Sequence, residues 1–177
     1  MHRQPLLNLL AKHQPSDENE AKMLTEMITF VNQNPDCFKR ELLIGHITGS
    51  SWIVDKSRKY VLLTHHRKLN KWLQPGGHCD GDPDVLNVAL KEANEETGVA
   101  GIKPVSEDIF DVDIHLIPER KGVPQHYHYD VRFLLEADKE IPLVVSDESN
   151  DLAWIAIGEL PKLNDEESIL RMVRKTL

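Results

Sequence analysis

The segment between residues 77 and 99 constrains this chain more than any other stretch of its sequence. It reads GHCDGDPDVLNVALKEANEETGV, and its second half suits a helix. On such a helix Glu92, Glu95 and Glu96 stand at positions i, i+3 and i+4 and share one face. Two carboxylates about 6 Å apart repel each other by about 3 kcal/mol at an effective dielectric constant of about 20. A divalent cation would turn that repulsion into binding, and Mg²⁺ prefers oxygen ligands of this kind.

An acidic helix face on its own is usually only a solvated surface. Glycines at fixed offsets on both sides make this one more specific. The segment resembles the Nudix box, G-x5-E-x7-R-E-U-x-E-E-x-G-U, in which U is apolar. The departures are Pro83, at the position of a glutamate, and Lys91, at the position of an arginine. Seven of the nine defined positions match: Gly77, Glu92, Ala93, Glu95, Glu96, Gly98 and Val99.

The Nudix resemblance implies both a fold and an activity. The fold is an α/β/α sandwich around a mixed β-sheet, α+β in class, and the strand pattern extends the resemblance over residues 45–177. The activity is that of a pyrophosphohydrolase, in which Mg²⁺ or Mn²⁺ bridges a diphosphate while water attacks one phosphorus. The implied substrate is a small phosphorylated molecule, a nucleoside diphosphate joined to another group. Nudix proteins often dimerise, so a homodimer is also among the expectations.

The resemblance assigns roles to residues of the box. Glu92, Glu95 and Glu96 take the metal, with the Gly77 carbonyl as a further ligand. The metal neutralises charge on the leaving phosphate and lowers the pKa of its bound water. Lys91 replaces the arginine that orients a catalytic carboxylate, although lysine makes one charged hydrogen bond and not a bidentate fork. The predicted catalytic residues are therefore Glu92, Glu95 and Lys91.

Two points of the mechanism stay open at this stage. The general base of the family comes from the box, where Glu95 is the candidate, or from a later loop, where Asp147 and Glu148 are the candidates. Pro83 cannot hold a metal through its side chain. Three nearby acids could compensate for it or could be solvated turn residues: Asp80, Asp82 and Asp84.

A second group of polar side chains falls in the segment 125–135. On a strand, His126, His128, Asp130 and Arg132 share one face, and two histidines beside an arginine suit contact with phosphate. Single histidines and basic loop residues are more often satisfied or solvated groups. Asp113 and His115 could face the same way from an adjacent strand, and Arg67, Lys68 and Lys71 precede the glycine-rich turn. The predicted substrate-binding residues are Arg67, His126, His128 and Arg132.

The order of expected elements supports the α+β class. Residues 1–44 form an N-terminal helical extension that packs on a Nudix domain at 45–177. Its helices run over 5–12 and from a Ser16 N-cap to about residue 34, with further helical turns between 37 and 43. Strands are expected at 47–54, 60–64, 109–117, 125–135 and 152–155, with a polar loop at 65–73 and a closing helix at 166–176.

The box helix has recognisable ends. Asp82 is the expected N-cap, with Pro83 at the first helical position, where a missing N–H costs nothing. Gly98 suits the position just past the C-terminus. The apolar residues expected to face the core are Val85, Val88, Ala89 and Ala93.

Composition excludes several other classes of protein. The chain has 177 residues, 40% of them hydrophobic and 28% charged, which is ordinary for a globular domain. A net charge of −8 argues against non-specific binding to nucleic acid. No apolar run approaches the length of about 20 residues that a membrane span needs. The two cysteines, Cys37 and Cys79, do not suggest a disulfide framework, so a cytoplasmic location is expected.

Two other functions compete with hydrolysis. The first is a non-catalytic Nudix domain that binds or senses a nucleotide, which the changes at Pro83 and Lys91 leave open. The second is an isomerase of the Nudix superfamily acting on an isoprenoid diphosphate, which would use a catalytic cysteine such as Cys79 and histidine metal ligands. The complete E-x-x-E-E-x-G pattern favours hydrolysis. Substrate identity lies in the loops 65–74, 118–125 and 145–151, whose sequences are not diagnostic.

Overall fold

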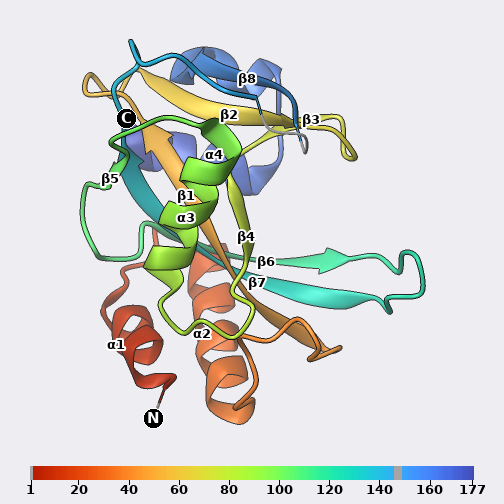
Figure 1. Ribbon diagram of the computed structural model, residues 1–177. Helices are drawn as coiled ribbons and strands as arrows, with labels where there is room; N and C mark the ends of the chain where they lie inside the picture. Colours follow the sequence, from red (N-terminus) through yellow and green to blue (C-terminus); the bar gives the residue numbers. More distant parts are fainter. Residues whose placement is uncertain (1, 146–148) are drawn as a thin grey trace.

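The computed structural model describes residues 2–145 and 149–177. One mixed β-sheet carries the fold, with helices on both of its faces (Figure 1). The helices are α1 (Gln4–Lys12), α2 (Glu18–Gln33), α3 (Val85–Thr97), the 3-10 helix η1 (Ile157–Lys162) and α4 (Glu167–Thr176). The strands are β1 (Gly45–Val54), β2 (Tyr60–His66), β3 (Lys71–Leu73), β4 (Gly76–His78), β5 (Lys103–Pro104), β6 (Asp111–Ile117), β7 (His126–Glu136) and β8 (Ser149–Ala156).

Strand β1 is the centre of the sheet. It pairs antiparallel with β2 and β4, and parallel with β7 from Gly45 opposite Tyr127 to Val54 opposite Glu136. Strands β5 and β6 pair antiparallel with β7, and β3 and β8 pair antiparallel with β2. The mixture of parallel and antiparallel pairs confirms the predicted α+β fold with a mixed sheet.

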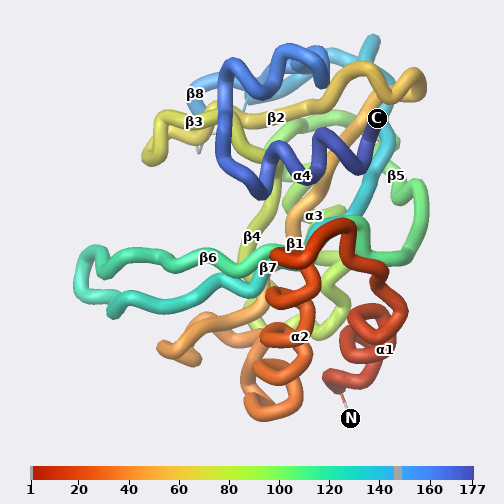
Figure 2. Tube along the Cα trace, turned by 180° about the vertical axis from the view of Figure 1, so that it is seen from behind, coloured from red at the N-terminus to blue at the C-terminus, as the bar shows by residue number. Residues whose placement is uncertain are grey.

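Side chains of β1 contribute to two hydrophobic cores, because successive side chains of a strand point to opposite faces of the sheet. Ile47 and Ile53 belong to the core that α1, α2 and α3 cover, and Trp52 and Val54 belong to the core under α4 and η1. Figures 1 and 2 show α3 on one side of β1 and α4 on the other. The N-terminal helices therefore share a core with the sheet and the box helix.

Several predicted boundaries were wrong. Asp17, and not Ser16, caps α2, because its carboxylate accepts the Glu20 N–H at 2.7 Å. Residues 37–43 form turns and no helix. The segment 65–73, predicted to be a loop, contains the end of β2 and strand β3, which pair as a hairpin from Thr64 opposite Leu73. Local composition there is polar, but the hairpin satisfies the backbone hydrogen bonds that a loop would leave open.

No helix in the part of the chain that the structure describes is both long and apolar enough to cross a membrane.

Candidate active site

Helix α3 begins later than its sequence suggested. Asp84 is the N-cap, and its carboxylate accepts the Asn87 N–H at 3.0 Å. The prediction of Asp82 as cap with Pro83 at the first helical position was therefore wrong by two residues. Asp82 instead accepts the backbone N–H of Asp84 at 2.9 Å, which tightens the turn ahead of the helix.

The other end of α3 and its buried face follow the prediction. Gly98 adopts the left-handed conformation, with φ of 64°, and its N–H bonds to the Asn94 carbonyl at 2.9 Å. Glycine reaches this conformation without the steric cost that other residues incur. The face with Val85, Val88, Ala89 and Ala93 is buried in the core. The three glutamates consequently lie outside that core.

Two of these glutamates meet the glycine-rich strand β4. The Glu96 carboxylate accepts the Gly76 N–H at 2.9 Å. The Glu92 carboxylate lies so close to Gly77 that a Cβ added there would be 2.5 Å from Glu92 Cδ. Gly77 is opposite Gly49 of β1, so the central strand holds it in place. The structure thus brings together Glu92, Glu96 and Gly77, three members of the predicted metal-binding set.

Glu95 and Lys91 lie apart from this contact. Both side chains are exposed, and Lys91 Nζ is 3.9 Å from Glu95 Oε1 across one helical turn. An exposed pair of this kind contributes little to stability. Lys91 therefore sits where it can orient the Glu95 carboxylate, the contact that the family arginine was expected to make.

The donor atoms around β4 suit a hard divalent cation. Carboxylate and carbonyl oxygens are the ligands that Mg²⁺ and Mn²⁺ prefer. Gly77 contributes a carbonyl on a strand, and its missing Cβ leaves space that the Glu92 carboxylate fills. The residues present therefore fit Mg²⁺ or Mn²⁺ as the bound metal.

The acids proposed to compensate for Pro83 have structural partners. Arg40 makes a two-pronged contact with Asp80, at 2.5 Å from both Nε and Nη2. Asp82 and Asp84 hydrogen-bond within the turn that leads into α3. The late-loop candidates for the general base, Asp147 and Glu148, lie outside the described residues.

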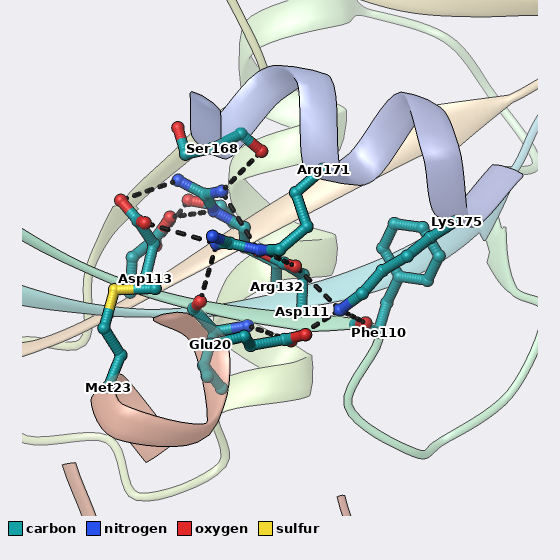
Figure 3. Close-up of polar contacts among 12 residues, drawn as sticks. Glu20, Met23, Phe110, Asp111, Asp113, Arg132, Ser168, Arg171 and Lys175 are labelled. Carbon is teal, nitrogen blue, oxygen red and sulfur yellow. Dashed lines mark hydrogen bonds and ion pairs between the residues drawn. The ribbon is translucent and has the colours of Figure 1, made fainter. Parts of the chain in front are cut away.

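Arg132 lies in a buried network of charges (Figure 3). Its side chain is 3% exposed, and it pairs with Asp130 at 2.8 Å, Asp111 at 3.1 Å and Asp113 at 3.3 Å. From α4, Arg171 adds a bidentate contact with Asp111, at 2.8 and 2.9 Å. Burial acts against the charged guanidinium of Arg132, but the three aspartates outweigh it and raise its pKa. Arg132 is thus tied to carboxylates of the protein.

Asp130 links this network to the neighbouring strand. Its Oδ1 accepts hydrogen bonds from Thr48 at 2.9 Å and Ser50 at 2.7 Å. The polar residues of β1, β6 and β7 therefore share one face of the sheet, continuous from Arg132 towards the histidines.

The basic residues ahead of the glycine-rich turn remain at the surface. Arg67 is exposed and makes one long contact, from Nη2 to the Ser149 carbonyl at 3.4 Å. Lys68 is exposed, and Lys71 pairs with Glu166. Of the predicted substrate-binding residues, Arg67 is thus the exposed cation.

His126 and His128 belong to a cluster of histidines that the sequence did not reveal as a whole. His46 of β1 and His78 of β4 complete it, with ring centroids 4.9 to 5.2 Å apart among the contacting pairs. Burial first, and then the neighbouring His78 and His126, lower the pKa of His46 to about 4. Burial and the surrounding histidines lower the pKa of His128 to about 2. The lowered pKa values favour the neutral forms of the His46 and His128 rings at pH 7.

The sequence held a partial signal for this cluster. His126 and His128 are two residues apart and so point to the same face of a strand. His78 directly follows Gly77, the first glycine of the Nudix box. His46, however, reaches His128 only through the parallel pairing of β1 and β7, where the two residues are opposite each other. A pairing between strands about 80 residues apart in the sequence cannot be read from local patterns.

Cys79 does not resemble a catalytic thiol. It is 4% exposed, and burial raises the pKa of its thiol above the usual range. Reactive cysteines depend on the thiolate, which burial disfavours.

Comparisons with known proteins agree with this architecture. A model of the NUDIX domain matches residues 46–175. Bis(5'-nucleosyl)-tetraphosphatase (asymmetrical) of Rattus norvegicus is 26% identical over 111 residues, 63% of this chain and 73% of that protein. A probable DHNTP pyrophosphohydrolase of Lactococcus lactis is 32% identical over 94 residues, 52% of this chain and 55% of that protein. The crystal structure of an Ap4A hydrolase of C. elegans has a TM-score of 0.59 at 21% identity and covers 73% of this chain and 93% of its own.

The chain therefore belongs to the NUDIX domain family, since the family model covers more than half of it. The resemblance seen in the box is confirmed, and with it the enzyme class, a Nudix-type pyrophosphohydrolase.

Proposed function

We propose that this protein hydrolyses a diphosphate linkage in a nucleoside diphosphate joined to another group, with a divalent metal as cofactor. One observation carries the proposal. The box helix and strand β4 bring the Glu92 carboxylate against Gly77 and the Glu96 carboxylate onto the Gly76 N–H. This arrangement places two box carboxylates against the glycine turn of β4. The relatives named as a tetraphosphatase and a DHNTP pyrophosphohydrolase support a phosphorylated, nucleotide-like substrate.

The roles of the residues follow from their positions. Glu92, Glu96 and the Gly77 carbonyl would hold Mg²⁺ or Mn²⁺, with Glu95 as the further carboxylate of the set. When bound, the metal supplies charge neutralisation at the leaving phosphate and acidifies water. Glu95 is the proposed base that accepts a proton from the attacking water. Lys91, whose Nζ lies 3.9 Å from Glu95 Oε1, is proposed to orient the Glu95 carboxylate.

Substrate contacts come from a different part of the surface. Arg67 is exposed, and it makes one long hydrogen bond to the Ser149 carbonyl. We propose that its guanidinium binds phosphate oxygens of the substrate. His126 and His128 lie on the polar face of β7 and are proposed to border the substrate site. Arg132 is proposed to act on substrate indirectly, by holding Asp130 and hence Thr48 and Ser50.

The test is a screen of purified protein with Mg²⁺ or Mn²⁺ against dinucleoside polyphosphates, nucleoside triphosphates, pterin triphosphates and nucleoside diphosphate sugars. Products are identified by chromatography, and the reaction in ¹⁸O-labelled water shows whether oxygen from water enters a phosphate product. We expect turnover of at least one class with label incorporation. The absence of turnover across the panel, with nucleotide binding retained, would instead support a non-catalytic binding domain.

The isomerase alternative makes a different demand on Cys79. A catalytic thiol should be accessible and ionisable, whereas Cys79 is buried and its pKa is raised. A Cys79→Ala protein should keep its hydrolytic turnover, because the change removes the thiol and adds no polar group. A folded Cys79→Ala protein that lost all turnover would return the cysteine to the mechanism. Both cysteines are unpaired and buried, which supports our proposal of a reducing, cytoplasmic location.

A further inference from the structure

Three histidines from three strands converge beside the box turn. They are His46 of β1, His78 of β4 and His128 of β7, and their ring centroids are 4.9 to 5.0 Å apart. One ring nitrogen from each lies within 4.8 Å of the other two. Among the described residues, no other group of three histidine, cysteine or acidic side chains has donor atoms this close together.

Three ring nitrogens of this cluster have no hydrogen-bond partner among the described residues. His46 is 3% exposed, and both of its ring nitrogens are buried without a hydrogen-bond partner among the described residues. His128 Nε2 is in the same position. Burying polar atoms in this way is unfavourable unless something else satisfies them. The rings of β1 and β7 that carry these nitrogens have donor atoms within 4.8 Å of each other and of His78, and a bound ion would satisfy them.

We propose that His46, His78 and His128 form a transition-metal site, selective for an ion such as Zn²⁺ and separate from the carboxylate site on α3. Imidazole nitrogen suits zinc, copper and nickel, whereas carboxylate and carbonyl oxygens suit magnesium and manganese. The two sites thus select different metals by their donor atoms. The proposal does not depend on the hydrolytic reaction, because metal binding is measured without substrate.

The distances are close to those of a zinc site. Zinc–nitrogen bonds of about 2.0–2.1 Å in a tetrahedral site place two ligand nitrogens roughly 3.4 Å apart. The ligand nitrogens here lie within 4.8 Å of one another. They reach the zinc spacing if each nitrogen moves towards the centre of the cluster by less than about 1 Å.

His126 is placed to complete or orient the site. Its ring centroid is 5.0 Å from that of His46 and 5.2 Å from that of His128. Its Nδ1 lies 2.8 Å from the Pro124 carbonyl, which favours a proton on Nδ1 and leaves the Nε2 lone pair for a ligand role. Backbone carbonyls commonly fix the tautomer of a metal-binding histidine in this manner.

The location gives the metal a structural consequence. His78 directly follows Gly77, the residue against which the Glu92 carboxylate lies, and both belong to β4. This strand has only three residues and is paired along one edge with β1. A metal that joins His78 to His46 and His128 would hold β4 in register and so position the glycine turn under α3.

The test uses the full chain, stripped of metal with a chelator and then titrated with Zn²⁺, in parallel with Co²⁺ as a spectroscopic substitute. We expect one tightly bound Zn²⁺ per chain, a rise in the unfolding temperature, and visible absorption bands of a nitrogen-ligated Co²⁺ site. His46→Phe and His128→Gln should each weaken Zn²⁺ binding by at least about 100-fold, the upper end of what loss of an outer-shell partner costs. His2→Gln, a change at an exposed histidine, is the matched control and should bind Zn²⁺ like the parent.

The metal-free variants separate a metal site from a purely structural cluster. Because the ring nitrogens of His46 have no partner, His46→Phe should leave the unfolding temperature of the metal-free protein unchanged or raise it. Only the increase caused by Zn²⁺ should disappear. Absence of stoichiometric Zn²⁺ binding by the folded parent, or equal binding by the folded His128→Gln protein, would overturn the proposal.

Discussion

The Glu92 carboxylate occupies the space that a side chain at Gly77 would need. A Cβ on Gly77 would lie 2.5 Å from Glu92 Cδ and 2.7 to 2.8 Å from its two oxygens. The glycine of the box is therefore matched to a glutamate fifteen residues later, on another element. Two of the proposed metal ligands, Glu92 and the Gly77 carbonyl, are brought together by this single close approach.

Gly77→Ala tests that relationship directly. The added methyl group should displace the Glu92 carboxylate, and misplacement of a catalytic group by about 1 Å can lower a rate by about 100-fold. We therefore expect kcat/KM to fall by about 10- to 100-fold. Stability should change little, because the displaced atoms are the far end of a flexible side chain.

Gly158→Ala is the matched control for that substitution. A Cβ at Gly158 would meet no heavy atom within 4 Å. Its kinetics and unfolding temperature should equal those of the parent. A Gly77→Ala protein with parental kcat/KM would show that the Glu92 position does not matter for turnover.

Glu20 makes the stability of the protein sensitive to acid. It is fully buried and accepts hydrogen bonds from His13 at 2.8 Å and from Ser16. It also accepts a hydrogen bond from Lys175 of α4, as Figure 3 shows. Burial would raise the pKa of the Glu20 carboxyl, but these partners outweigh it and hold the pKa well below its usual range. Because the folded pKa is the lower one, the contribution is present above the unfolded pKa of about 4.3 and is lost as pH falls below it.

Glu20→Gln should therefore destabilise the protein by about 3–5 kcal/mol at neutral pH, the usual cost of breaking a buried ion pair. Urea unfolding at several pH values measures the effect. The difference between parent and variant should shrink as pH falls below about 4. A difference that stayed constant across that range would mean that ionisation of Glu20 is not the source.

Arg132→Met tests whether Arg132 is part of the fold or of the binding surface. The substitution removes the buried ion pairs that Arg132 makes with Asp130 and Asp111. Asp111 keeps Arg171, and Asp130 keeps only its two hydroxyl donors. Loss of the charge partner of Asp130 should lower the free energy of unfolding by about 3–5 kcal/mol. Denaturant titration gives this number. Parental stability together with a raised KM would show instead that the arginine serves substrate.

Arg67→Ala provides the contrast, because Arg67 is exposed and makes one long backbone contact. Its stability should stay at the parental value. Loss of a charge-assisted hydrogen bond to phosphate, about 1.5–3 kcal/mol, should lower kcat/KM by about tenfold or more. Kinetics identical to the parent would remove Arg67 from the substrate site.

The box shows what a sequence reveals well and what it does not. The apolar spacing of Val85, Val88 and Ala89 and the glycine at 98 gave the helix, its buried face and its end, because these are local properties. Its start was misjudged, because Asp82 and Asp84 are both acceptable caps and only the packed turn selects Asp84. Family membership, which rests on the box, was confirmed. The α+β class, which rests on the order of helices and strands, was confirmed as well.

The histidine cluster shows the opposite case. His46 and His128 are adjacent because β1 and β7 pair in parallel, with the box helix and several strands between them in the sequence. Likewise, Arg132 looked accessible on its strand, but α4 supplies Arg171 and the backbone that close over it. Long-range pairing and helix docking decide both outcomes, and neither leaves a local signature.

Metal dependence of turnover tests the central claim most directly. Initial rates are measured against Mg²⁺ concentration for the parent, Glu92→Gln and Glu96→Gln, with Glu26→Gln, an exposed change on α2, as the control. If the glutamates hold the metal, both box variants should stay folded but need far more Mg²⁺ or lose turnover at saturation, while Glu26→Gln behaves like the parent. Parental rates and parental Mg²⁺ dependence in both box variants would contradict the account.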